Sequence, residues 1–118
     1  MQVGSRDRAQ PFTTLDGSTI RVVLDAVAGG AVNQSLAEAE LAPGQETRRH
    51  YHAATEEIYV LVEGHAEMEV DGDRASVQPG DAILIPAGAR HQIRAGESGV
   101  RFLCCCAPRY SDGDTFFD

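Results

Sequence analysis

Turns that contain glycine or proline divide this chain into short segments, and their spacing limits the fold more than any other feature of the sequence. Each turn supplies a residue that tolerates positive φ or that fixes φ near a corner. Many short segments joined by such turns are typical of a β-sandwich or a β-barrel. Five turns stand out: Leu15-Asp-Gly-Ser18, Val62-Glu-Gly64, Val70-Asp-Gly-Asp73, Gln78-Pro-Gly-Asp81 and Pro86-Ala-Gly88.

The segments between the turns have the composition of β-strands. They are rich in β-branched residues or alternate between apolar and polar residues, and helix signals are nearly absent. One segment, 36–41, contains the helix formers Ala and Glu, but Pro43-Gly44 stops a helix early and the alternation favours a strand. We therefore predict an all-β protein. The predicted strands cover residues 20–24, 35–41, 57–62, 65–70, 82–85 and 91–94, with a last strand at 100–107.

The length of 118 residues fits one domain with a modest core, and a second domain is not expected. The hydrophobic content of 42% is ordinary for a globular protein. No apolar run approaches the roughly 18 residues that a membrane helix needs. The N-terminus lacks the apolar region of a secretory signal, so we expect a cytoplasmic protein with no membrane partner.

The charge of the chain excludes several classes of function. The formal net charge is -8, whereas nucleic-acid binders present basic surfaces, so we expect no nucleic-acid partner. All ten basic residues are arginines. The absence of lysine excludes Schiff-base chemistry and a lysine general base.

The three cysteines are consecutive, at Cys104, Cys105 and Cys106. Neighbouring residues on a strand point to opposite faces, so this run is no disulfide framework, and we expect reduced thiols. If Arg101 faces water, then Phe102, Cys104 and Cys106 face inward. Inward cysteines behave as small buried hydrophobes, and the alternative is that Cys104 or Cys106 is a ligand or redox partner beside a metal.

Four side chains that bind metals well stand close together in the turn-rich frame: His50, His52, Glu57 and His91. Residues two apart on a strand share a face, so His50 and His52 can present both imidazoles to one ion. Three neutral imidazoles and one carboxylate suit Mn, Fe, Ni, Co, Cu or Zn, and they leave positions open for water or substrate. This donor set does not choose among those metals.

The segments 44–64 and 80–91 resemble the paired motifs of the cupin superfamily. The first motif of that family is Gly, five residues, His-x-His, three or four residues, Glu, six residues and Gly. The second is Gly, five residues, Pro-x-Gly, two residues, His, three residues and Asn. One position departs, because Ala95 stands where the family usually has Asn, which is not a metal ligand. The matching residues are Gly44, His50, His52, Glu57 and Gly64, then Gly80, Pro86, Gly88 and His91.

The resemblance implies a double-stranded β-helix, the cupin jelly-roll barrel, with one divalent metal held by the three histidines and Glu57. It also implies a homodimer formed through N-terminal strands. We accordingly expect an N-terminal arm at residues 1–18, within a dimer interface, and a cupin barrel at 19–107. Residues 108–118 form a C-terminal extension whose aromatic residues need cover from the barrel or a partner subunit.

Glu56 rivals Glu57 as the carboxylate ligand, because it fits the looser spacing of three residues after His52. Counting back from Gly64 selects Glu57. The same count puts Glu57, Tyr59 and Leu61 on one face of their strand, which leaves Glu56 on the solvent side.

Two more residues are candidates for a catalytic role. Arg48 lies two residues before His50 and shares its direction if the strand is regular, so it could hold a substrate carboxylate, and the alternative is a solvated rim position. An inward Tyr59 could donate to a bound oxygen or could serve only for packing. His65 is expected on the surface.

The leading hypothesis is a small metalloenzyme that acts on a small, oxygenated or carboxylated organic substrate by dioxygenase-like or Lewis-acid chemistry. Few other ionisable side chains are predicted to face inward, which favours an apolar pocket and an aromatic or aliphatic substrate. The alternative is a non-catalytic module that binds or senses a small ligand through the metal. A structural role is disfavoured by the complete ligand set.

Overall fold

The structure is a computed structural model that describes residues 1–118. Its regular structure consists almost entirely of antiparallel strands, as the alternating segments predict, and its only helix is one short 3₁₀ turn. No helix has the length and apolar composition required to cross a membrane. The elements are β1 (Phe12–Thr13), β2 (Thr19–Leu24), β3 (Ser35–Leu41), β4 (Tyr51–His52), β5 (Glu56–Val70), β6 (Asp73–Val77), β7 (Ala82–Ile85), β8 (His91–Ala107), η1 (Asp112–Asp114) and β9 (Thr115–Phe116).

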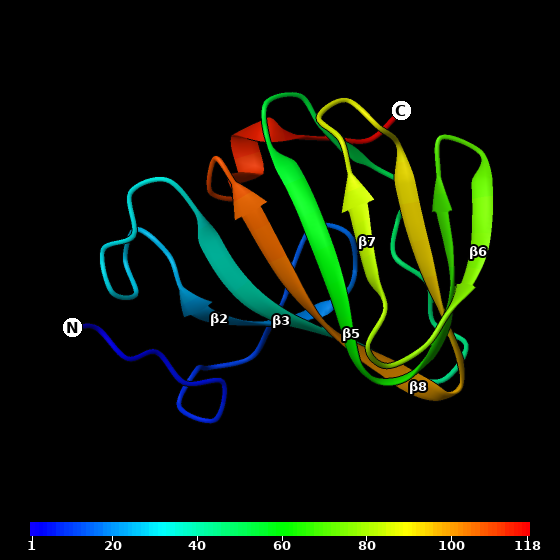
Figure 1. Cartoon of the computed structure of the whole chain (residues 1–118), viewed down its shortest axis with the longest axis horizontal. Helices are drawn as coiled ribbons and strands as arrows, with labels where there is room; N and C mark the ends of the chain where they lie inside the picture. Colours follow the sequence, from blue (N-terminus) through cyan, green and yellow to red (C-terminus); the bar gives the residue numbers. More distant parts are fainter.

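Seven strands form one curved antiparallel sheet in the order β1-β2-β3-β8-β5-β6, and β7 pairs with β5. The two long strands β5 and β8 lie side by side along most of their length and form the centre of the fold (Figure 1). A separate two-stranded sheet joins β4 to β9, which brings the C-terminal segment onto the loop that carries the first histidines. The all-β prediction is therefore confirmed.

The predicted strands at 20–24, 35–41 and 82–85 correspond to β2, β3 and β7. The predicted turn at Gly64 is wrong, because 57–62 and 65–70 are two halves of the single strand β5. Gly64 has φ 82°, and a Cβ there would collide with the carbonyl oxygen of Gly99 on β8. The glycine thus lets two long strands cross closely and change register, and the strand bends where a turn was expected. Likewise, the predicted strands at 91–94 and 100–107 are parts of β8.

The core lies between the inward faces of β3, β5, β7 and β8. Alternation puts every second residue of each strand inside, where apolar side chains pack against one another. Burial of this apolar surface is the main force that holds the barrel closed. The largest fully buried apolar residues are Leu41, Leu61, Ile85, Ile93 and Phe102.

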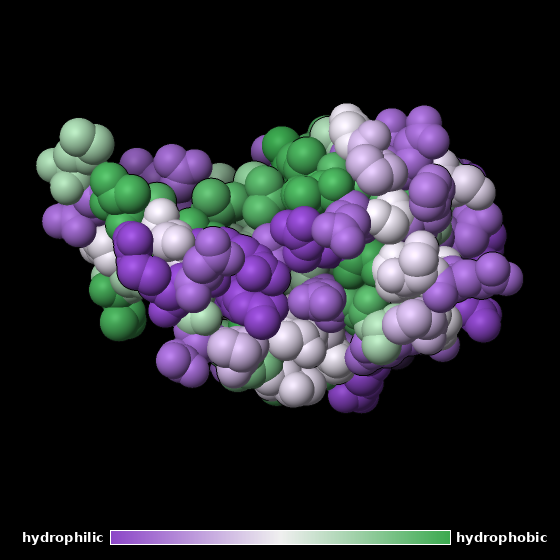
Figure 2. All heavy atoms as spheres, turned by 90° about the horizontal axis from the view of Figure 1, so that it is seen from below, coloured by the Kyte–Doolittle hydropathy of each residue, from purple (hydrophilic) through white to green (hydrophobic).

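The outer face of the central strands exposes apolar side chains. Ile58 on β5 and Leu84 on β7 are register partners, with 38% and 56% of their surface exposed, and Val62 follows on β5. On the face drawn in Figure 2, apolar residues likewise gather into patches between hydrophilic ones. The N-terminal segment is anchored to the sheet where Nε of Arg6 donates to the buried carboxylate of Glu38 at 2.8 Å.

Candidate metal centre

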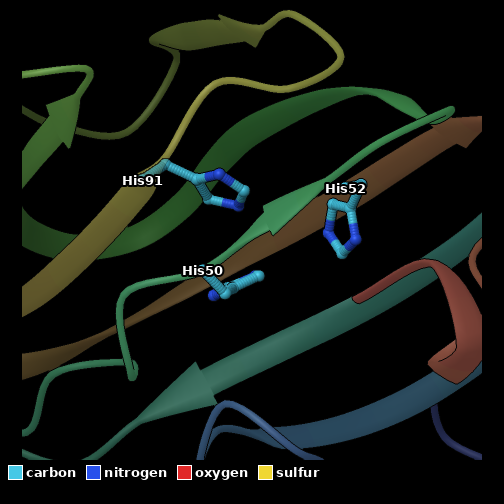
Figure 3. Close-up of side chains that lie close together, drawn as sticks. All are labelled: His50, His52 and His91. Atoms are coloured by element: carbon cyan, nitrogen blue, oxygen red, sulfur yellow. The ribbon is translucent and has the colours of Figure 1, made fainter. Parts of the chain in front are cut away.

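Three histidines from two distant parts of the chain meet at one end of the barrel. His50 precedes β4, His52 lies in β4, and His91 begins β8. Reciprocal backbone hydrogen bonds of 3.1 and 2.8 Å join His50 to His91 and fix the two segments side by side. One nitrogen from each ring lies within 4.8 Å of the other two, and the rings surround a common space (Figure 3).

Each ring is oriented by a hydrogen bond from its Nδ1 atom to a backbone carbonyl. For His50 and His91 the acceptor is the carbonyl two residues earlier, that of Arg48 at 2.7 Å and that of Ala89 at 3.0 Å. Nδ1 of His52 lies 3.2 Å from the carbonyl of Asp114. Since a carbonyl only accepts, each Nδ1 carries the proton, and in the neutral ring Nε2 keeps its lone pair. Metal-binding histidines are commonly oriented in this way.

Glu57 completes a group of facing acceptors. Its Oε1 lies 3.3 Å from Nε2 of His52 and 3.6 Å from Nε2 of His91. Oε1 of Glu57 and Nε2 of His91 are buried and have no hydrogen-bond partner. Lone pairs that face one another in a buried site are favourable only with a proton or a cation between them. The donor set of three imidazoles and one carboxylate therefore fits a divalent transition metal.

The electrostatics of the site reflect these contacts. Burial alone would raise the pKa of Glu57, but contacts with His52 and His91 outweigh burial and lower it to about 2. Burial lowers the pKa of His50, and the neighbouring His91 adds to this effect. Burial would also lower the pKa of His52, but the contact with Glu57 raises it. The contacts between Glu57 and the imidazoles thus outweigh burial at Glu57 and at His52.

The choice of Glu57 over Glu56 agrees with the orientation of β5. Glu57, Tyr59 and Leu61 are buried and face inward, whereas Glu56 is exposed. His65 is also exposed, as expected.

Arg48 lies at the rim of the site. The chain between β3 and β4 is irregular, and the backbone N–H of Arg48 donates to the carbonyl of Asp16. Its guanidinium is exposed and stacks 4.0 Å above the ring of Phe117. The rim position is thus the one that the structure adopts, and Arg48 does not line the pocket.

A small pocket of about 90 Å³ opens beside the histidines, between β2, β3, β5 and β8. Tyr59 lines it and packs with its ring centre 4.6 Å from that of Phe102 and 5.9 Å from that of His91. Burial raises the pKa of Tyr59 well above its usual range, so its phenol stays neutral. No arginine lines the pocket, and most of the lining is apolar.

Cys104 and Cys106 line the same pocket, as the alternation on the last strand predicts. Sγ of Cys106 donates to Oε2 of Glu57 at 3.2 Å. Burial, with Glu57 nearby, raises the pKa of the Cys106 thiol and keeps it protonated. Cys106 therefore serves as a hydrogen-bond donor to Glu57. This role differs from both alternatives drawn from the sequence, a small buried hydrophobe and a ligand or redox partner beside the metal.

Sequence reasoning missed two aspartates. Asp16 was interpreted only as part of a turn, yet it lines the pocket and its Oδ2 lies 3.9 Å from Nε2 of His50. The carboxylate of Asp114 accepts hydrogen bonds of 3.1 to 3.2 Å from the backbone N–H groups of residues 53–55. No local signal reveals either role, because both depend on contacts between segments far apart in the chain.

The C-terminal extension lies against the site. β9 pairs with β4, so that Thr115 lies opposite His52 and Phe116 opposite Tyr51. Phe117 follows and packs 5.7 Å from the ring centre of His50. Burial would raise the pKa of Asp114, but the hydrogen bonds from the loop 53–55 lower it.

Comparison with known protein families shows to which family this barrel belongs. The family profile for the cupin domain matches residues 37–106, more than half of the chain. The chain belongs to the cupin family. This result confirms the resemblance given by the paired motifs and, with the antiparallel barrel, the jelly-roll fold that the resemblance implies.

Similar proteins include an uncharacterised one, MJ1618 of Methanocaldococcus jannaschii, which is 41% identical over 110 residues, 92% of this cupin and 88% of that protein. The polyketide synthase CurC of Streptomyces cyaneus is 30% identical over 93 residues, 78% of this cupin but only 60% of CurC. Among solved structures, the polyketide cyclase RemF from Streptomyces resistomycificus superposes with a TM-score of 0.80 at 27% identity. That match covers 91% of this cupin and 79% of RemF.

Proposed function

We propose that this cupin is a small metalloenzyme with one divalent metal held by His50, His52, Glu57 and His91. The observation that carries the proposal is the set of buried lone pairs on Glu57 and His91 that have no protein partner. A metal in such a site supplies Lewis acidity or activates oxygen. Mn, Fe, Ni, Co, Cu and Zn all suit the donor set.

The pocket favours a small aromatic or aliphatic substrate over a carboxylate. Arg48, the one candidate for a carboxylate clamp, stacks on Phe117 at the rim, and no arginine lines the pocket. Apolar residues such as Ile20 and Phe102 supply much of the wall. CurC is named as a polyketide synthase and RemF as a polyketide cyclase, so a substrate of the polyketide class is a further candidate for this pocket.

Within this proposal the side chains have distinct tasks. The backbone carbonyls hold the imidazoles in one tautomer, Cys106 orients Glu57, and Tyr59 offers a neutral phenol beside His91. Tyr59 is thus our candidate to donate a hydrogen bond to an oxygen of the substrate. Arg48 lies at the rim, stacked on Phe117, and does not line the pocket.

A metal analysis tests the proposal. Purified wild-type protein, loaded in turn with each of the six ions and then desalted, should retain about one equivalent of metal. His50→Ala and Glu57→Ala should lose it, whereas the matched control His65→Ala should retain it, because His65 is exposed and distant from the site. Wild-type protein without metal above background would refute the metal centre.

A turnover screen then separates an enzyme from the alternative of a binding or sensing module. Oxygen uptake with phenolic compounds, in the Fe or Cu form, indicates oxygen chemistry, and conversion without oxygen in the Zn or Ni form indicates Lewis-acid chemistry. A protein that binds phenolic compounds in all metal forms but never converts them would be a binding module.

The three unpaired cysteines agree with a cytoplasmic location, which belongs to the same proposal.

A further inference from the structure

The turn between β1 and β2 delivers a second carboxylate to the pocket. Asp16 is held by its own turn, because its Oδ1 accepts hydrogen bonds from the backbone N–H and the hydroxyl of Ser18, at 2.9 and 2.6 Å. The turn is closed by backbone hydrogen bonds between Thr14 and Ser18 and between Gly17 and Thr14, each 3.0 Å long. Only 13% of the Asp16 side chain is exposed. Its carboxylate therefore has a fixed position.

The second oxygen of this carboxylate has no partner in the protein. Oδ1 takes both hydrogen bonds from Ser18, and Oδ2 accepts none. Oδ2 instead lies 3.9 Å from Nε2 of His50, which is itself a lone-pair atom because Nδ1 of that ring donates to the carbonyl of Arg48. Oδ2 is thus a free acceptor in the pocket, next to one of the proposed metal ligands, and it suits a hydrogen-bond donor.

The charge of the pocket also favours a neutral or cationic ligand that donates hydrogen bonds. Asp16, Asp25 and Glu57 line it, and no arginine does. A divalent metal would offset two of these three negative charges, so the loaded pocket still carries one. An anionic ligand is disfavoured by this field, while a neutral or cationic ligand is accepted.

We propose that Asp16 is a substrate-binding residue whose Oδ2 accepts a hydrogen bond from an O–H or N–H group of a neutral or cationic substrate beside His50. This inference rests on the proposed function, because it assumes that the pocket next to the metal receives the substrate. It narrows the substrate class to hydroxyl- or amine-bearing compounds and excludes simple carboxylates.

Three probes of one shape test the inference on metal-loaded, full-length protein: benzyl alcohol, benzylamine and benzoate. Their affinities are measured by ligand-observed NMR competition. Wild-type protein should bind the alcohol and the amine at least about tenfold more tightly than benzoate, as expected of a hydrogen bond to a charged group. Asp16→Asn should bind both donors about tenfold more weakly and should bind benzoate more tightly. The control Asp73→Asn, at an exposed position at the start of β6, should match the wild type.

A second variant guards against a folding defect at Asp16. Ser18→Ala leaves the carboxylate in place but removes one of its two anchors, so it should weaken donor binding by a smaller factor while the charge preference stays. Thermal unfolding of each variant identifies the folded ones.

The other outcomes separate this inference from the metal proposal. Metal-loaded wild-type protein that binds benzoate as tightly as the donors, or binds no donor, overturns the role of Asp16 and leaves the metal centre intact. A fall of more than about tenfold in the metal affinity of Asp16→Asn also overturns it, because Asp16 would then be a metal ligand. Wild-type protein that binds the donors with this preference but retains no metal refutes the proposed function alone.

Discussion

The backbone carbonyl of Asp114 lies 3.2 Å from Nδ1 of His52, so the C-terminal segment orients one ring of the candidate metal centre. The carboxylate of the same residue accepts hydrogen bonds from the loop 53–55, which joins His52 to Glu57. One residue thus holds a ligand ring and the loop between two ligands. Asp114 is a positioning residue that sequence spacing does not reveal.

Asp114→Ala should therefore weaken metal binding. Removal of the carboxylate frees three backbone N–H groups and loosens both His52 and the loop, and loss of such supporting contacts costs about tenfold or more in metal affinity. Competition with a chelator measures the affinity, and the visible absorption of the Co²⁺ form reports the coordination geometry. The neighbouring exposed Asp112 supplies the control, Asp112→Ala. A folded Asp114→Ala protein with wild-type affinity and an unchanged Co²⁺ spectrum would contradict the prediction.

The same carboxylate should contribute to the acid sensitivity of the fold. The pKa of Asp114 is lower in the folded protein than in the unfolded chain, so its stabilisation is fully present above the ordinary aspartate pKa of about 4. It is lost as the pH falls through the folded pKa. The difference in unfolding free energy between wild type and Asp114→Asn should therefore shrink below about pH 4. Urea unfolding of the metal-free proteins at several pH values measures it, and a constant difference would argue against this linkage.

Cys106 should support Glu57 through its thiol. Cys106→Ser keeps a hydrogen-bond donor near Oε2 of Glu57 and should keep most of the metal affinity, whereas Cys106→Ala leaves that buried oxygen unpaired and should lose about tenfold. Cys105→Ala, on the opposite face of β8, is the matched control. The chelator assay applies here as well. Equal affinities of Cys106→Ser and Cys106→Ala would show that the thiol only fills space.

Local patterns predicted the strands and the histidine positions well, because alternation and fixed spacing are properties of short segments. The choice between Glu56 and Glu57 also followed from alternation, since β5 is regular between Glu57 and Leu61. The prediction failed at Gly64. Both a turn and a close contact between two strands require glycine, and only the position of Gly99, far away in the sequence, shows that the second applies here. Asp16 and Asp114 escaped notice because an Asp-Gly turn or an acidic tail has the same sequence whether it faces water or docks on a site.

Metal should stabilise the folded protein because it binds the native state and not the unfolded chain. A ligand that binds only the native state at one hundred times its Kd adds about 2.7 kcal/mol to the unfolding free energy. Wild-type protein with an excess of the preferred metal should therefore unfold at a higher urea concentration than the metal-free form. His91→Ala, which removes one of the unpartnered acceptors, should show little or no shift, and His65→Ala should behave as the wild type. A shift of equal size in His91→Ala would place the stabilising metal elsewhere.

The homodimer expected from the family resemblance should use the outer face of β5 and β7 in addition to the N-terminal arm at residues 1–18. Ile58 and Leu84 are cross-strand neighbours that expose 38% and 56% of their surface, and Val62 extends the row to a further exposed apolar side chain. Apolar side chains grouped on one exposed face mark interaction surfaces, and a second copy brings an equally apolar face without opposing charge. Leu84→Asp puts two like charges near the symmetry axis and should convert the dimer to a monomer in sedimentation velocity. Val27→Asp alters an apolar loop residue that is 95% exposed and should leave the dimer intact. A wild-type protein that sediments as a monomer at high concentration would rule out this interface, and a dimer that persists in Leu84→Asp would place it on another face.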